Sequence, residues 1–147
     1  MSIVRRFLPL FVFLMLFTLV AMAQQRINAC HVKKEDVGEE RIVCGTVTNT
    51  RYVDTGKTNP TFLNMGGRYP QQCFTVVIWG EDRKQFIDDL RAKHAESERP
   101  EEYYLHRGIC VTGKIQEYKT KPQITLKNPA DIGPQKTNPN GQSGSEL

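Results

Sequence analysis

The apolar residues of this chain change their spacing twice along the sequence, and this change restricts the fold more than any other feature. Five segments carry apolar and β-branched residues in patterns typical of strands, with a period of two in the longest. Between the third and fourth of them, over 81–97, apolar residues recur at helical spacing behind an acidic first turn, which the helix dipole favours. The predicted strands are 41–53, 61–65, 73–79, 108–118 and 123–127.

Three strands, one helix and two further strands is the element order of the OB-fold, a five-stranded, partly open Greek-key barrel. Alternation places Gly45 and Gly113 at inward positions of the first and fourth strands, where a strand must bend or bulge to close a small barrel. The predicted fold is therefore mainly β, with one α-helix between strands 3 and 4. A small α+β sandwich is the alternative.

The first 23 residues are predicted to be a signal peptide. Arg5 and Arg6 precede the unbroken apolar run Phe7–Val20, and Ala21–Ala23 supplies the small residues of a cleavage site. A retained membrane anchor is the rival interpretation, although the run reaches only the short end of the length that spans a bilayer. We expect cleavage before Gln24, no stable membrane anchor, and a periplasmic or secreted protein.

Residues 24–132 are predicted to form one folded domain, beginning with a helical turn over 30–38. Residues 133–147 contain one apolar side chain, too little to offset the entropy of ordering, so a disordered tail is expected. Hydrophobic residues make up 39% of the chain, which argues against disorder elsewhere. A domain this small buries limited apolar surface and benefits from covalent cross-links.

Four cysteines lie in this exported domain, an even number that predicts two disulfides with three possible connectivities. A metal site is not expected, because no two cysteines have C-x-x-C spacing and the three histidines lie at no ligand-like spacing from them. No cofactor is expected either. The cysteines are Cys30, Cys44, Cys73 and Cys110.

Four short segments together resemble an exported bacterial OB-fold family. They are Val43-Cys44-Gly45-x-Val47, PTFLNMGGRYP at 60–70, FTVVIW at 74–79 and CVTGKI at 110–115. The resemblance covers about 38–132 and implies a relation to nucleic-acid-binding OB domains of the anticodon-binding type, which sometimes accompany nuclease modules. OB-folds also bind sugars and proteins, so the resemblance is more specific for the fold than for the ligand.

In an OB barrel, the first and fourth strands are antiparallel neighbours. Alternation places Cys44 and Cys110 on the outward face of these strands, where a cross-strand pair can reach disulfide spacing. We therefore predict a Cys44–Cys110 disulfide, with two separate thiols as the alternative. Cys30–Cys73 would follow by elimination. The family pattern does not call for cysteine at either of these last two positions.

The sequence offers no motif for catalysis. It contains neither a G-x-S-x-G nucleophile elbow nor a phosphate-binding glycine loop, and each histidine stands apart from the others. Acidic residues concentrate in 81–102, which is interpreted as the solvated face of a helix rather than as the metal cluster of a nuclease. We expect a protein that is not an enzyme.

The distribution of charge is more informative than the formal total of +4, which falls to +2 without the first 23 residues. Segments 48–79 and 114–127 carry net charges of +2 and +3, whereas 81–102 carries −3. In an OB-fold the first two segments contribute the binding face and its loops, and the helix lies away from them. Positive charge is therefore predicted where a polyanion would bind.

Tyrosines fall in the same two segments, and single-stranded nucleic acid is typically held by cations on its phosphates and aromatic rings on its bases. The predicted function is a non-catalytic, exported binding module for single-stranded DNA or RNA. The alternatives are a protein- or glycan-binding module of the cell envelope and a nuclease accessory domain. Phe62 and Trp79 are expected to fill or cover the barrel. The predicted binding residues are Arg51, Tyr52, Lys57, Arg68, Tyr69, Tyr118, Lys119 and Lys121.

Overall fold

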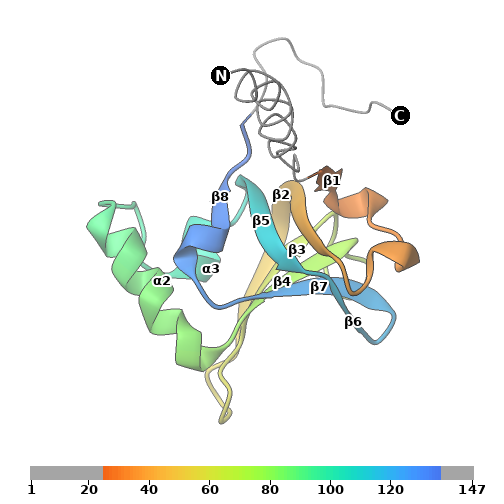
Figure 1. Ribbon diagram of the computed structural model, residues 1–147. Helices are drawn as coiled ribbons and strands as arrows, with labels where there is room; N and C mark the ends of the chain where they lie inside the picture. The colour runs from red at the N-terminus through yellow and green to blue at the C-terminus, as the bar shows by residue number, and fades with distance from the viewer. Residues whose placement is uncertain (1–24, 137–147) are drawn as a thin grey trace, which may run out of the picture.

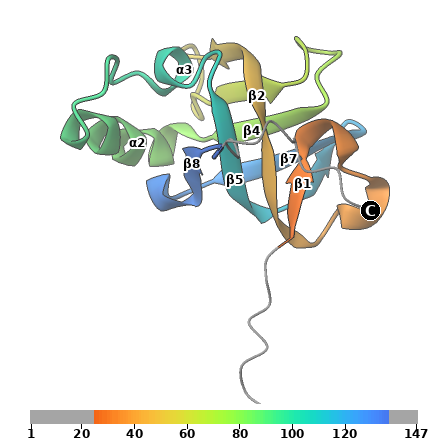
Figure 2. The same ribbon diagram turned by 90° about the horizontal axis from the view of Figure 1, so that it is seen from above.

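A computed structural model describes residues 25–136, which form a mainly β structure with one main helix (Figures 1 and 2). The predicted signal peptide lies outside the described residues. The strands are β1 (Arg26–Asn28), β2 (Glu40–Tyr52), β3 (Thr61–Met65), β4 (Phe74–Ile78), β5 (Gly108–Lys114), β6 (Gln116–Tyr118), β7 (Lys121–Leu126) and β8 (Ile132–Pro134). The helices are α2 (Gly80–Ala92) and α3 (Pro100–Tyr103), with 3₁₀ turns at Ala29–His31, Lys34–Asp36 and Pro129–Asp131.

Strand β2 organises the sheet because its 13 residues pair with three strands, of which β1 lies parallel to it over Ile42–Cys44. Its first half is antiparallel to β5, its second half is antiparallel to β3, and the register shifts between Val47 and Asn49. Strand β4 continues the sheet antiparallel to β3 and parallel to β7. The sheet thereby curls into an OB-like barrel, with α2 on one side and the β6–β7 hairpin on the other (Figure 1).

The five predicted strands are present to within two residues at nearly every end, but the structure has eight strands instead of five. The predicted strand over 108–118 is divided at Ile115, whose backbone bonds to Gly38 and Glu39 before the chain turns to pair with β7. Strands β1 and β8 have three residues each, too few to show a period. The predicted helix also ends earlier, at Ala92, and α3 follows separately.

The predicted boundary between domain and tail falls inside β8. Gly133 pairs with Cys110, and the backbone N–H of Gln135 donates to the carbonyl oxygen of Gly108 at 2.9 Å. The folded segment therefore extends past Ile132, because this stretch bonds to the open edge of β5. The rest of the predicted tail, from 137 onward, lies outside the described residues.

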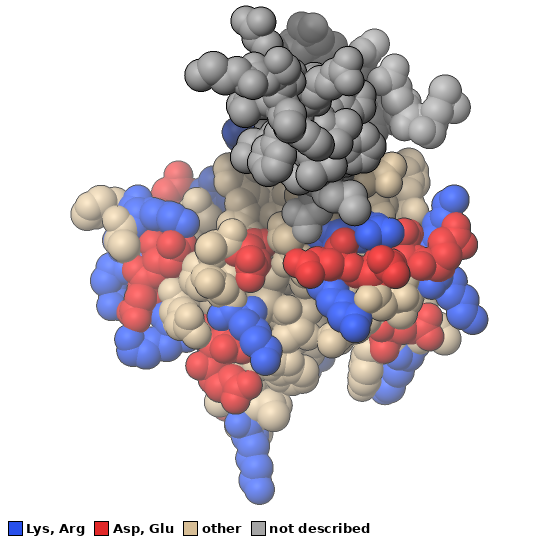
Figure 3. Space-filling model, in the orientation of Figure 1, with Lys and Arg blue, Asp and Glu red and all other residues tan. Residues whose placement is uncertain are grey.

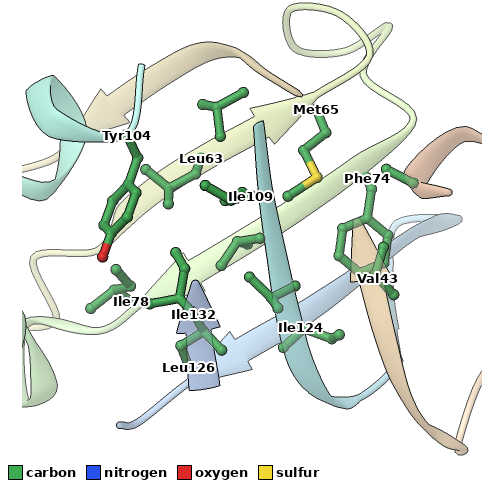
Figure 4. Packing of buried hydrophobic residues seen from close by; sticks show 14 of the residues in the cluster. Val43, Leu63, Met65, Phe74, Ile78, Tyr104, Ile109, Ile124, Leu126 and Ile132 are labelled. Atoms are coloured by element: carbon green, nitrogen blue, oxygen red, sulfur yellow. The ribbon is translucent and has the colours of Figure 1, made fainter. Parts of the chain in front are cut away.

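The core fills the space between the two halves of the curled sheet. Large apolar side chains from β2, β3, β4, β5 and β7 point toward one another there, with Tyr104 at one end (Figure 4). Gly45 and Gly113 face this interior, as predicted. A Cβ at Gly45 would lie 2.9 Å from Ala29 Cβ, and one at Gly113 would lie 2.9 Å from Ile124 Cγ2. Both positions favour glycine because the side chains of Ala29 and Ile124 approach the backbone so closely.

Two disulfides cross-link the domain, and both predicted pairings are confirmed. Cys44 and Cys110 lie directly opposite each other on β2 and β5. Cys30–Cys73 joins the first 3₁₀ turn to the end of the loop between β3 and β4. Two disulfides are compatible with an oxidising extracellular environment.

None of the helices in residues 25–136 is long and apolar enough to cross a bilayer.

A buried ion pair ties the helices to the barrel. Arg83 of α2 lies 2.7 Å from a carboxylate oxygen of Glu101 on α3, and it also donates to the hydroxyl of Thr61 on β3. The backbone carbonyl of Glu101 accepts a hydrogen bond from the Thr50 hydroxyl at 2.9 Å. The Arg83 guanidinium also covers the ring of Tyr52, 3.9 Å from its centre. These contacts fix both helices against β2 and β3.

Candidate functional site

A groove of about 500 Å³ lies on the outer surface of the barrel. Strands β2, β3 and β4 form its floor, and it is bordered by the loop over 66–73 and by the β6–β7 hairpin. Five of the eight predicted binding residues line it, although they come from three separate parts of the chain. These five are Arg51, Tyr69, Tyr118, Lys119 and Lys121.

The basic side chains of the groove lack acidic partners. Arg51, Lys119 and Lys121 line the groove together with no acidic residue, and none of them lies within 4.0 Å of a carboxylate among residues 25–136. By contrast, Lys84 on α2 and Lys93 just after its end each pair with an aspartate four residues away in the chain. The cations of the groove are therefore free to pair with an external anion.

On one face of the molecule the charges are mixed (Figure 3). On the face shown in Figure 3, acidic and basic side chains lie interspersed across the described residues. A modest net charge spread in this way attracts a polyanion weakly. In the groove, three cations lie together in a lining that contains no acidic residue.

Two tyrosines of the groove are unusually exposed for large side chains. Tyr69, on the 66–73 loop, is 67% exposed, and Tyr118, at the end of β6, is 58% exposed. They are the exposed large hydrophobic side chains of the described residues, and both line the same groove. Exposed aromatic faces beside unpaired cations provide the two kinds of contact that single-stranded nucleic acid requires.

A strained turn holds Lys119 beside Tyr118. The two residues between β6 and β7, Lys119 and Thr120, have φ values of 47° and 66°. A two-residue hairpin of type I′ needs positive φ at both positions, where glycine and asparagine are the usual residues and a β-branched residue is rare. The turn keeps the Lys119 Nζ 5.4 Å from the Tyr118 ring centre. Strain of this kind costs about 1–3 kcal/mol and clusters at binding sites.

The floor of the groove carries a buried chain of polar side chains that the sequence reasoning missed. Gln72 donates to the Thr75 hydroxyl at 3.2 Å, Thr75 donates to Asn64 at 3.0 Å, and Asn64 donates to Asn49 at 3.3 Å. Asn64 and Thr75 are buried although they lie on the outer side of the sheet, and the buried Gln72 of the 66–73 loop bonds to Thr75 there. No local pattern in the sequence signals this burial.

The structure places the other predicted binding residues elsewhere. Tyr52 follows Arg51 on β2, so strand alternation turns it to the opposite face, where Arg83 covers its ring. Lys57 and Arg68 are exposed but do not line the groove. The loop that carries Lys57 projects from the lower end of the barrel in Figure 1. We therefore leave these three residues out of the candidate site.

Two aromatic residues, Phe62 and Trp79, were expected to fill or cover the barrel. Phe62 is half-buried and lines the groove, because on β3 it lies opposite Arg51 of β2. Trp79 is half-buried and precedes the first residue of α2, outside the groove lining. Apolar character therefore did not distinguish the core face of β3 from its groove face.

Comparison with known proteins gives only distant likenesses. No protein-family model and no curated protein matches the chain. A putative aspartyl-tRNA synthetase from Leishmania major Friedlin has a TM-score of 0.46 and 9% identity over 80% of this chain, which corresponds to 22% of the synthetase. OBody AM1L10, solved bound to hen egg-white lysozyme, has a TM-score of 0.43 and 17% identity, covering 76% of this chain and 92% of that one. These low scores carry no conclusion about function.

Proposed function

We propose that this protein is an exported binding module, without catalysis of its own, that holds single-stranded DNA or RNA in the groove between the 66–73 loop and the β6–β7 hairpin. The observation that supports this function is the composition of the groove. Two exposed tyrosines and three cations without acidic partners converge there from three parts of the chain.

The cations set the expected salt dependence. If Arg51, Lys119 and Lys121 each neutralise one phosphate of a single strand, the logarithm of affinity falls against the logarithm of salt with a slope of about −2. Three phosphate contacts give weak binding at physiological salt. Stacking on Tyr69 and Tyr118 adds roughly 1–3 kcal/mol for each base, independent of salt.

The test is a fluorescence-anisotropy titration of the protein with a labelled oligodeoxythymidylate of about 12 nucleotides, repeated over a range of salt concentrations. Lys121→Ala should reduce the magnitude of the salt slope by about 0.7, because one counterion fewer is released. Tyr118→Ala should weaken binding by about fivefold or more and leave the slope unchanged.

Lys93→Ala is the matched control, because Lys93 pairs with Asp89 at 2.6 Å on α2, outside the groove lining. It should leave both affinity and slope unchanged. Absence of binding at low salt would reject the proposal. Tight binding of cell-wall glycan, indifferent to salt, would favour the envelope-binding alternative. Shortening of the oligonucleotide on a denaturing gel would favour a nuclease role.

A further inference from the structure

We propose that the Cys30–Cys73 disulfide positions the wall of the groove that carries Tyr69, and thereby sets the affinity for nucleic acid. This inference rests on the proposed function of the groove.

The disulfide contacts both ends of the 66–73 loop. Cys73 is the last residue of the loop, and its backbone N–H donates to the carbonyl oxygen of Met65 at 2.9 Å. Gly66 is the first residue of the loop and packs against the sulfur atoms of Cys30 and Cys73, which a Cβ at Gly66 would overlap. With a φ of 71°, Gly66 also has a backbone conformation that favours glycine. The disulfide therefore bonds one end of the loop to Cys30 and packs against the other end.

The remaining attachments of the loop are hydrogen bonds. The Thr48 hydroxyl accepts from the Gly67 N–H at 2.9 Å, and the Gln72 side chain donates to Thr75 at 3.2 Å. Between these points the chain turns back on itself, with Gln71 N–H donating to the Arg68 carbonyl at 2.7 Å, and Tyr69 projects into solvent. A side chain as exposed as Tyr69 has little packing of its own, so the anchors of the loop decide its position.

The second disulfide of this protein serves as the control for the first. Cys44–Cys110 is a second disulfide, which joins β2 to β5 and is absent from the groove lining. The two bonds join residues 43 and 66 positions apart, and chain entropy depends only weakly on that difference. Removing either bond should therefore lower stability to a similar extent. Only the removal of Cys30–Cys73 should change the groove.

The experiment compares Cys30→Ser/Cys73→Ser with Cys44→Ala/Cys110→Ala at a temperature well below unfolding. The affinity for the labelled oligodeoxythymidylate should fall about tenfold in the first variant, the equivalent of one stacked base, and stay unchanged in the second. Hydrogen exchange of the amides of 66–73, measured without ligand, should accelerate in the first variant alone.

Equal affinities in the wild type and the first variant, with unchanged exchange over 66–73, would overturn the inference. So would equal weakening in both variants, which would indicate a general loss of stability. If the wild type itself does not bind, the proposed function fails, and the exchange measurement still decides whether the disulfide orders the loop.

If the first variant does not fold, a titration of the wild type with reductant replaces it. Cys30 is exposed and Cys44 is buried, so the Cys30–Cys73 bond is the more accessible one. Binding should fall in step with its loss, as followed by alkylation and mass spectrometry. Binding that persists after this bond opens, while Cys44–Cys110 is intact, would overturn the inference.

Discussion

Removing the negative charge of Glu101 should destabilise the domain more than the same change at an exposed glutamate. In Glu101→Gln, Arg83 keeps its charge in a buried position and loses its carboxylate partner at 2.7 Å. The two side chains are only 10% and 8% exposed, so water does not replace the lost contact. Breaking one partner of a buried ion pair typically costs about 3–5 kcal/mol.

Two remaining contacts place the expected cost at the lower end of that range. Arg83 still donates to the Thr61 hydroxyl and still lies 3.9 Å from the centre of the Tyr52 ring, where a desolvated cation–π contact is worth up to about 2 kcal/mol. The glutamine also offers an amide oxygen in place of the carboxylate. We therefore expect the free energy of unfolding to fall by about 3 kcal/mol.

The assay is equilibrium unfolding in urea, for which a single domain of this size is expected to behave as two-state. The midpoint should fall while the m-value stays constant, because the folded structure persists. Glu98→Gln is the matched control. Glu98 pairs with Arg91 at a similar distance, 2.8 Å, but both side chains are exposed, and stability should hardly change.

A cost below about 1 kcal/mol for Glu101→Gln would refute this reasoning, because the pair would then behave like an exposed one. Replacing both charges, with Arg83→Met and Glu101→Leu, offers a second check. The double variant should be more stable than Glu101→Gln alone, since neither charge remains buried without a partner.

Three further changes test other parts of the structure. Gly113→Ala should lower the free energy of unfolding by about 1–3 kcal/mol in urea, because its Cβ would lie 2.9 Å from Ile124 Cγ2, whereas Gly133→Ala meets nothing within 4 Å and should be neutral. Cys44→Ala/Cys110→Ala should lower the free energy of unfolding, measured in urea, by up to about 4 kcal/mol. No change would show that β2 and β5 are held together without help from the disulfide. Burial, with smaller contributions from Asp89 and Tyr103, raises the pKa of Tyr104, so the folded protein keeps a proton that the unfolded chain loses above about pH 10. Stability should therefore fall above that pH by up to about 1.4 kcal/mol per pH unit, and a Tyr104→Phe variant with the same slope would contradict the assignment.

The sequence by itself determined the elements and the inner face of the barrel. Periodicity is a local property, so β2, β3, β4, α2 and β7 could be located from the spacing of apolar residues alone. Alternation on β2 and β5 also placed Gly45 and Gly113 inward, and it put Cys44 and Cys110 where a disulfide could join them. The sequence likewise indicated Arg51, Tyr69, Tyr118, Lys119 and Lys121 as candidate binding residues, since charge and aromatic content can be counted segment by segment.

Only the tertiary structure decided which of these residues share a surface. All five residues of β4 are buried, so its sequence does not distinguish the core face from the face under the 66–73 loop. Asn64 and Thr75 are buried, and Thr75 accepts a hydrogen bond from Gln72 of that loop. The loop is joined to Cys30, which lies in a three-residue turn too short to show a period. The ring of Tyr52, on the opposite face of β2 from the groove, is covered by Arg83, which lies 31 positions further along the chain. Contacts between segments so far apart depend on how the chain closes in space, and the residues of each segment do not encode that closure locally.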